Sequence, residues 1–104
     1  HLVHHGHVEP RAYGQKECLE AGIQFARTEG IMPAPEATHA IKGAVDEALK
    51  CKAEGKSKSI LFNLCGHGHF DMQAYMDYFS GELAEDSFDS KAFEESLSAI
   101  PAVN

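Results

Sequence analysis

The sequence is poor in basic residues and has no cluster of them. Its 104 residues include 9 Lys and Arg against 16 Asp and Glu, which gives a formal net charge of −7. A nucleic-acid-binding surface needs clustered Lys and Arg, so we expect no nucleic-acid partner. Residues 81–104 hold six acids and one base, and we interpret this tail as a solvated acidic segment.

The sequence also lacks membrane spans and a disulfide framework. No apolar run approaches the ~20 residues of a transmembrane helix, so no membrane partner is expected. The three cysteines, Cys18, Cys51 and Cys65, form no close pairs, which is typical of a reducing, cytoplasmic setting. The opening "HLVHHGHVEP" is too short and too rich in histidine for a signal peptide. It has no leading Met, and we interpret it as native sequence that begins within a longer protein.

The remaining features predict a chain of no more than one domain, in three parts. Residues 1–14 form an irregular lead-in, residues 15–80 an α/β part, and residues 81–104 an acidic linker with a C-terminal helix. Apolar content is 43%, an ordinary value for a globular protein that buries a modest core.

Hydrophobic periodicity places the elements. Helices are predicted at about 15–29 and from Pro35 or Glu36 to about Glu54, each followed by a Gly that ends it. "SILFNL", residues 59–64, predicts a short buried strand, and a helix is expected from about 71 to 79. Ser90 can cap a last helix. The pattern therefore predicts an α/β fold with helices packed on one or two strands.

The stretch "FNLCGHGHFD", residues 62–71, concentrates residues that carry chemistry. One alternative is a metal hydrolase fragment that uses His67, His69 and Asp71, because "HGHFD" fits the first part of the H-x-H-x-D-H zinc motif. The final His of that motif is Met72 here, and no His follows His69 in the sequence.

Three further interpretations of this stretch remain. A Cys phosphatase needs an Arg in the loop of Cys65, and the nearest in sequence is Arg27. A dinucleotide fingerprint needs a third glycine after Gly66 and Gly68. Two glycines alone can simply form a tight turn, as in a non-catalytic α/β interaction module.

Two long blocks, correctly spaced, resemble the C-terminal region of the tryptophan synthase β chain, most closely its second, stand-alone type. "EGIMPAPEATHA" is similar to a Glu-Gly-Ile-hydrophobic-Pro-Ala-x-Glu-x-x-His-Ala block, and "NLCGHGHFD" to Asn-Leu-Ser-Gly-x-Gly-x-x-Asp. "HLVHHGHVEPRAYGQ" also looks like the lead-in of this type. The resemblance covers nearly the whole chain.

This resemblance implies a fold-type II enzyme that uses pyridoxal 5′-phosphate (PLP) and converts L-serine and indole to L-tryptophan by β-replacement. It implies that Cys65 is the partner of the pyridine nitrogen, that Gly66 and Gly68 shape the wall beneath the ring, and that Glu36 is a catalytic residue near the ring and the substrate. It implies no metal. It also implies that the rest of the parent chain is a partner, and it favours a homodimer.

Two departures from the family pattern matter. The family usually has Ser where this chain has Cys65, and a thiol is a poorer hydrogen-bonding group than a hydroxyl. The Schiff-base lysine and the Gly-rich phosphate loop lie upstream in the family, and none of the lysines here has that context. The lysines are Lys16, Lys42, Lys50, Lys52, Lys56, Lys58 and Lys91. We therefore expect a C-terminal fragment that is inactive by itself.

Overall fold

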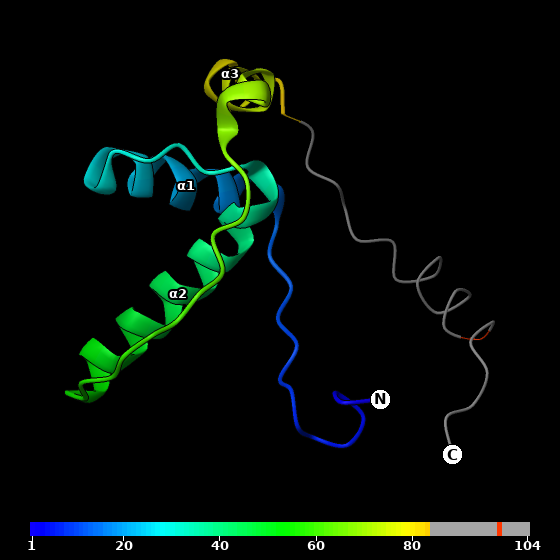
Figure 1. The fold of residues 1–104 in the computed structure, drawn as a ribbon, viewed down its shortest axis with the longest axis vertical. Coiled ribbons are helices and arrows are strands. Elements are labelled where there is room, and N and C mark those ends of the chain that lie inside the picture. The colour runs from blue at the N-terminus through cyan, green and yellow to red at the C-terminus, as the bar shows by residue number, and fades with distance from the viewer. Residues whose placement is uncertain (84–97, 99–104) are drawn as a thin grey trace. The chain divides into compact units, whose positions relative to one another are not determined.

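A computed structural model describes residues 1–83 and residue 98 (Figure 1). Among the described residues, 13–83 belong to one compact unit, and residues 1–12 belong to a second. The helix predicted to begin at Ser90 lies outside the described residues, apart from Ser98. Within the described part, no helix is long and apolar enough to span a membrane.

The first helix, α1 (Gln15–Glu29), confirms the predicted range. The N–H of Gly14 donates to Glu17 Oε1 at 2.7 Å, so an acidic side chain satisfies a backbone donor before the helix starts. Gly30 ends the helix at φ 70°, a left-handed conformation that glycine adopts without strain, and its N–H donates to the Ala26 carbonyl.

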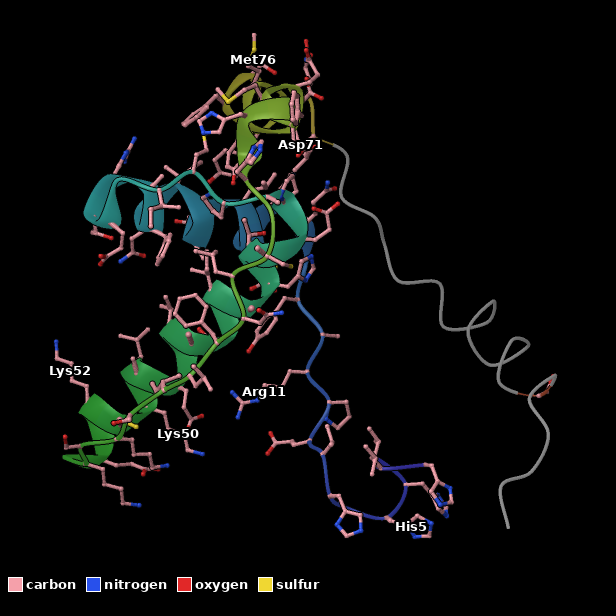
Figure 2. The ribbon with its side chains drawn as sticks, viewed as in Figure 1. His5, Arg11, Lys50, Lys52, Asp71 and Met76 are labelled. Atoms are coloured by element: carbon pink, nitrogen blue, oxygen red, sulfur yellow. The ribbon has the colours of Figure 1, made fainter. Side chains whose placement is uncertain are left out.

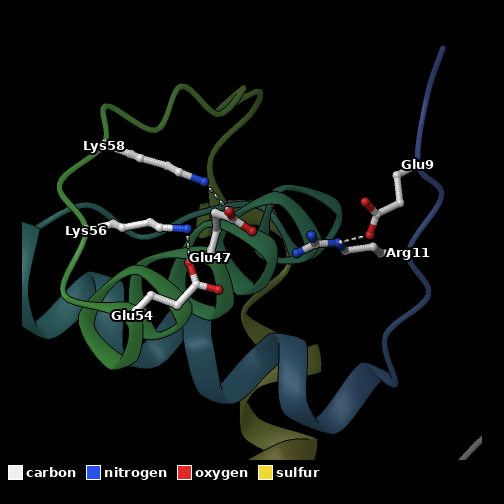
Figure 3. A network of polar contacts seen from close by, with 6 residues as sticks. All are labelled: Glu9, Arg11, Glu47, Glu54, Lys56 and Lys58. Atoms are coloured by element: carbon white, nitrogen blue, oxygen red, sulfur yellow. Dashed lines mark hydrogen bonds and ion pairs between the residues drawn. The ribbon is translucent and has the colours of Figure 1, made fainter.

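The second helix, α2 (Pro35–Glu54), also matches its prediction. Pro35 is its first residue, where a missing N–H costs nothing, and Gly55 ends it in the left-handed conformation. Ion pairs hold its second half: Lys58 Nζ lies 3.4 Å from Glu47 Oε1, and Lys56 Nζ lies 2.9 Å from the Glu54 carboxylate (Figure 3). These pairs are exposed or half-buried, so each contributes well under about 1 kcal/mol.

The core of this unit forms where α1 packs against the first half of α2. A Cβ on Gly22 would lie 2.5 Å from Thr38 Cγ2, so the glycine lets the two helices approach closely. Thr38 is fully buried, and its hydroxyl donates to the Pro35 carbonyl. The buried side chains of the two helices are Cys18, Leu19, Ala21, Ala37, Thr38, Ile41 and Cys51.

The prediction of a buried strand at residues 59–64 is wrong. Residues 56–65 are extended and run back along α2 (Figure 1), but no strand forms among the described residues. Leu61 is fully exposed, while the ring of Phe62 packs edge-on against Phe25 at 5.9 Å. A strand needs hydrogen-bonding neighbours, and this segment has none within the described part of the chain. The described fold is therefore helical rather than α/β.

A short 3₁₀ turn (η1, Gly68–Phe70) and the helix α3 (Met72–Ser80) follow, in agreement with the helix predicted at 71–79. α3 contributes one fully buried side chain, Tyr75, to the core. Met76 lies on the outer side of α3 (Figure 2) and is 59% exposed.

Residues 1–12 contain turns and no helix or strand. The N–H of His5 donates to the His1 carbonyl at 3.0 Å, and Gly6 has φ 73°. The rings of His1 and His5 (the latter labelled in Figure 2) meet edge-on at 4.4 Å, and Arg11 pairs with Glu9 at 3.2 Å (Figure 3).

Candidate functional site

The two sequence blocks singled out above lie side by side in the structure. The N–H of Gly68 donates to the Met32 carbonyl at 2.9 Å. Pro33 and His67 form an isolated antiparallel bridge. Residues from the "EGIMPAPEATHA" block therefore pair with the glycine turn, although about 35 positions separate the paired residues in sequence.

Both glycines of the turn are required by geometry. Gly66 has φ 70°, and a Cβ there would also lie 3.1 Å from the Ala34 Cβ. Gly68 is buried, and a Cβ on it would lie only 2.6 Å from the Pro33 carbonyl oxygen. The absence of side chains at these two positions therefore lets the turn pack closely against Pro33 and Ala34.

A third contact to this pair of segments comes from Tyr75 on α3. Its hydroxyl donates to the Pro33 carbonyl at 2.7 Å in a buried environment. Burial, and then the charge of Asp71, raise the pKa of Tyr75, so the hydroxyl keeps its proton as a donor. Tyr75 could not be identified from the sequence, because an aromatic residue on an amphipathic helix gives no sign of which acceptor its hydroxyl contacts.

Cys65 immediately precedes the turn and carries an exposed, free thiol. Cys18 and Cys51 are buried. Burial, followed by the charge of Glu17, raises the pKa of Cys18, so this thiol stays neutral and unreactive. Of the three cysteines, only Cys65 is open to a ligand.

Glu36 is the second residue of α2, and its side chain is exposed. A carboxylate in the first turn is stabilised by the positive end of the helix dipole. Only Pro35 separates it from Ala34, the residue that faces Gly66. The structure thus brings the N-terminal end of α2, which carries Glu36, next to the glycine turn that follows Cys65.

The metal-hydrolase alternative gains no support from this geometry. His67 Nδ1 accepts a hydrogen bond from the His69 N–H at 3.3 Å, and the two rings lie 5.0 Å apart. Asp71 is the residue immediately before α3. In the part of the chain that the structure describes, no three His, Cys, Asp or Glu side chains converge to hold a metal ion.

Among the lysines that the structure describes, Lys42 has a pKa that its surroundings shift. Its ammonium group bonds to Asp46 Oδ1 at 2.6 Å and lies 5.6 Å from the centre of the Tyr13 ring. The hydrogen bond to Asp46 raises the pKa of Lys42, against a smaller desolvation effect that lowers it. The group is therefore held as a cation, the opposite of what a nucleophilic amine requires.

An open pocket lies away from these residues. It has a volume of about 410 Å³ and is formed by residues of α1 and α3, among them Arg27 and Phe79. None of Glu36, Cys65, Gly66 or Gly68 lines it.

Comparison with known proteins gives relatives of one kind, although no family model matches the chain. The tryptophan synthase beta chain 2 of Methanosarcina mazei is 62% identical over 82 residues, which cover 79% of this chain and 19% of the relative. The protein of the same name from Aquifex aeolicus is 58% identical over 84 residues, or 81% of this chain and 19% of the relative. That of Thermococcus kodakarensis is 55% identical over 84 residues, with the same coverage.

This chain spans about a fifth of the length of these curated relatives. The resemblance carried by the two blocks is confirmed at 51–62% identity. About 80% of this chain is therefore similar, at 55–62% identity in these three cases, to proteins named tryptophan synthase beta chain 2.

Proposed function

We propose that this chain is the C-terminal part of a fold-type II, PLP-dependent tryptophan synthase of the β type, which joins L-serine and indole to give L-tryptophan. The observation that carries the proposal is the pairing of the two family blocks by Gly68, Met32 and Pro33. This pairing gathers the exposed thiol of Cys65 and the end of α2 that carries Glu36 around one turn.

The residues of this turn fit a PLP ring in their chemistry. Gly68 lets the turn pack against Pro33, and Gly66 leaves exposed backbone beside Cys65, against which we propose that a flat ring lies. Cys65 supplies an exposed, free thiol that can face a pyridine nitrogen. PLP, when bound, supplies an aromatic ring that withdraws electrons from the amino-acid substrate.

The thiol of Cys65, placed at the ring nitrogen, then sets how strongly the ring withdraws electrons. A neutral thiol at the ring nitrogen leaves that nitrogen largely unprotonated, whereas a carboxylate would stabilise its protonated form. A weaker electron sink favours elimination and replacement at Cβ over transamination. A thiol is a weaker donor and acceptor than the usual serine hydroxyl, so we expect this chain to hold the ring less tightly.

Glu36 is proposed to hold or accept a proton near the reacting atoms. Its carboxyl group is exposed in the first turn of α2, beside the turn that follows Cys65, where a bound substrate can reach it. A positioned general base contributes roughly 10²–10⁴-fold to the rate of such a step.

The other partners follow from the same proposal. The rest of the parent chain is proposed to supply the amine that binds the cofactor, because none of the lysines in this sequence has the context of the family's Schiff-base lysine. The chain by itself is then inactive. The parent is proposed to be a cytoplasmic homodimer.

A graft tests the proposal in a complete enzyme. The matched segment of the Methanosarcina mazei relative, 62% identical over 82 residues, is replaced by that of this chain. We expect the graft to bind PLP, seen as the visible absorbance of the bound cofactor, and to form tryptophan from serine and indole. Glu36→Gln in the graft should lower kcat about 10²-fold.

Glu29→Gln is the matched control, because Glu29 is also exposed but ends α1. It should leave kcat unchanged. A graft that folds without binding PLP would contradict the proposal and support the non-catalytic module instead. Equal effects of the two Glu→Gln changes would remove Glu36 from the mechanism.

A further inference from the structure

The ring of Tyr75 lies where three parts of the unit meet. It is 1% exposed, and its hydroxyl donates to the Pro33 carbonyl at 2.7 Å. Ideal Cβ positions on Gly22 and Gly68 would lie 3.2 Å from its hydroxyl oxygen and its Cε2, respectively. One side chain of α3 thus touches α1, the glycine turn and the segment that leads into α2.

Pro33 connects the two parts of the proposed site, which are the start of α2 and the turn that follows Cys65. Pro33 is bridged to His67 on one side and lies two residues before Pro35, the first residue of α2. A shift of Pro33 would move the start of α2, and with it Glu36, relative to the turn that follows Cys65.

The hydrogen bond from the Tyr75 hydroxyl to the Pro33 carbonyl joins α3 to the segment before α2 through a side chain. The neighbouring bond, from the Gly68 N–H to the Met32 carbonyl, is a backbone bond that no substitution of side chain removes. Burial raises the pKa of Tyr75, so the hydroxyl keeps the proton that it donates.

We propose that Tyr75 is a positioning residue: through its hydrogen bond to the Pro33 carbonyl it sets the spacing between Glu36 and Cys65 and thereby the fit of PLP. This inference rests on the proposed function above. Loss of the hydroxyl leaves the buried carbonyl without this donor, and the segment must move or admit water to satisfy it.

Tyr75→Phe in the graft enzyme tests the inference, because phenylalanine keeps the buried ring and removes only the donor. The dissociation constant of PLP is measured by fluorescence titration, well below the unfolding temperature. We expect it to rise at least threefold and the absorbance band of the bound cofactor to shift. Tyr78→Phe is the matched control, since Tyr78 is half-buried on the same helix and packs edge-on against Phe79; it should change neither.

The outcomes separate the two proposals. Failure of the unsubstituted graft to bind PLP overturns the proposed function and this inference with it. Normal binding with equal PLP affinity in Tyr75→Phe and Tyr78→Phe overturns only the role of Tyr75. A purely structural role would lower the melting temperature without changing the dissociation constant or the absorbance band.

A second measurement uses the 104-residue chain itself, and it decides the matter if the substituted graft does not fold. Hydrogen exchange of the Gly68 amide, which bonds to the Met32 carbonyl, is followed by NMR. We expect Tyr75→Phe to speed this exchange at least fivefold while leaving amides in the middle of α1 unchanged. Unchanged exchange at Gly68 overturns the inference.

Discussion

Substitution of Gly68 by Ala should destabilise the chain through one steric conflict. The new Cβ would lie 2.6 Å from the Pro33 carbonyl oxygen, 3.0 Å from Met32 Cγ and 3.2 Å from Tyr75 Cε2. The side chain of Met32 can move away, but the carbonyl cannot move without breaking its bond to the Tyr75 hydroxyl. The conflict is therefore with a fixed backbone atom.

The magnitude follows from two opposing effects. Overpacking a buried site costs about 1–3 kcal/mol. Replacing Gly by Ala also stiffens the unfolded chain, which recovers about 0.4–1 kcal/mol. We expect the free energy of unfolding to fall by about 1–2 kcal/mol, or about 1 M in the urea midpoint for a small domain.

Gly43→Ala is the control, since Gly43 lies inside α2 and a Cβ there meets only the Tyr13 ring at an ordinary 3.8 Å. It should stabilise the helix by up to about 1 kcal/mol. Urea unfolding followed by far-ultraviolet circular dichroism measures both variants. If Gly68→Ala is as stable as the native chain, the turn does not pack against Pro33 as described.

Three further predictions concern the thiol, the exposed surface and the response to pH. In the graft, Cys65→Ser should preserve or raise tryptophan formation. Cys65→Asp should raise transamination relative to tryptophan formation, because a carboxylate stabilises the protonated ring nitrogen. Unchanged product ratios would show that residue 65 does not face the ring nitrogen. The 104-residue chain exposes Leu61 fully and Phe70 to 92%, so light scattering should detect self-association that Leu61→Ser reduces, and a strictly monomeric native chain would contradict this. Cys18 and Tyr75 both have raised pKa values in the folded state, so each binds its proton more tightly there than in the unfolded chain. Urea unfolding should therefore show full stability near neutral pH and a loss as the pH rises past the ordinary pKa values of the two groups, about 8.5 for cysteine and about 10 for tyrosine. Cys18→Ala should lessen the early part of that loss.

The helices could be predicted from the sequence because their signals are local. Apolar spacing sets the buried faces of α1 and α2, and Gly30 and Gly55 end them within one residue of the expected positions. The segment at 59–64 could not be assigned in this way. A run such as "SILFNL" forms a strand only beside another strand, and the described residues offer none.

The candidate site was predictable in its composition but not in its assembly. The two blocks pointed to Glu36, Cys65, Gly66 and Gly68, and the structure brings the segments that carry them together. The roles of these four residues stay predictions. The hydroxyl of Tyr75 was missed because its acceptor, Pro33, is 42 positions away and leaves no local trace in the sequence.

That long separation has a consequence for the order in which the chain folds. α1 and α2 form from hydrogen bonds between residues close in sequence. The Tyr75 contact instead closes a loop of 42 positions, and the entropy lost in closing that loop opposes the contact until it forms. We expect this contact to be absent from the folding transition state, so that Tyr75→Phe speeds unfolding in stopped-flow experiments and leaves the folding rate nearly unchanged; a slower folding rate would contradict this. The turn beside Cys65 is then the last part of the unit to assemble and the first to open.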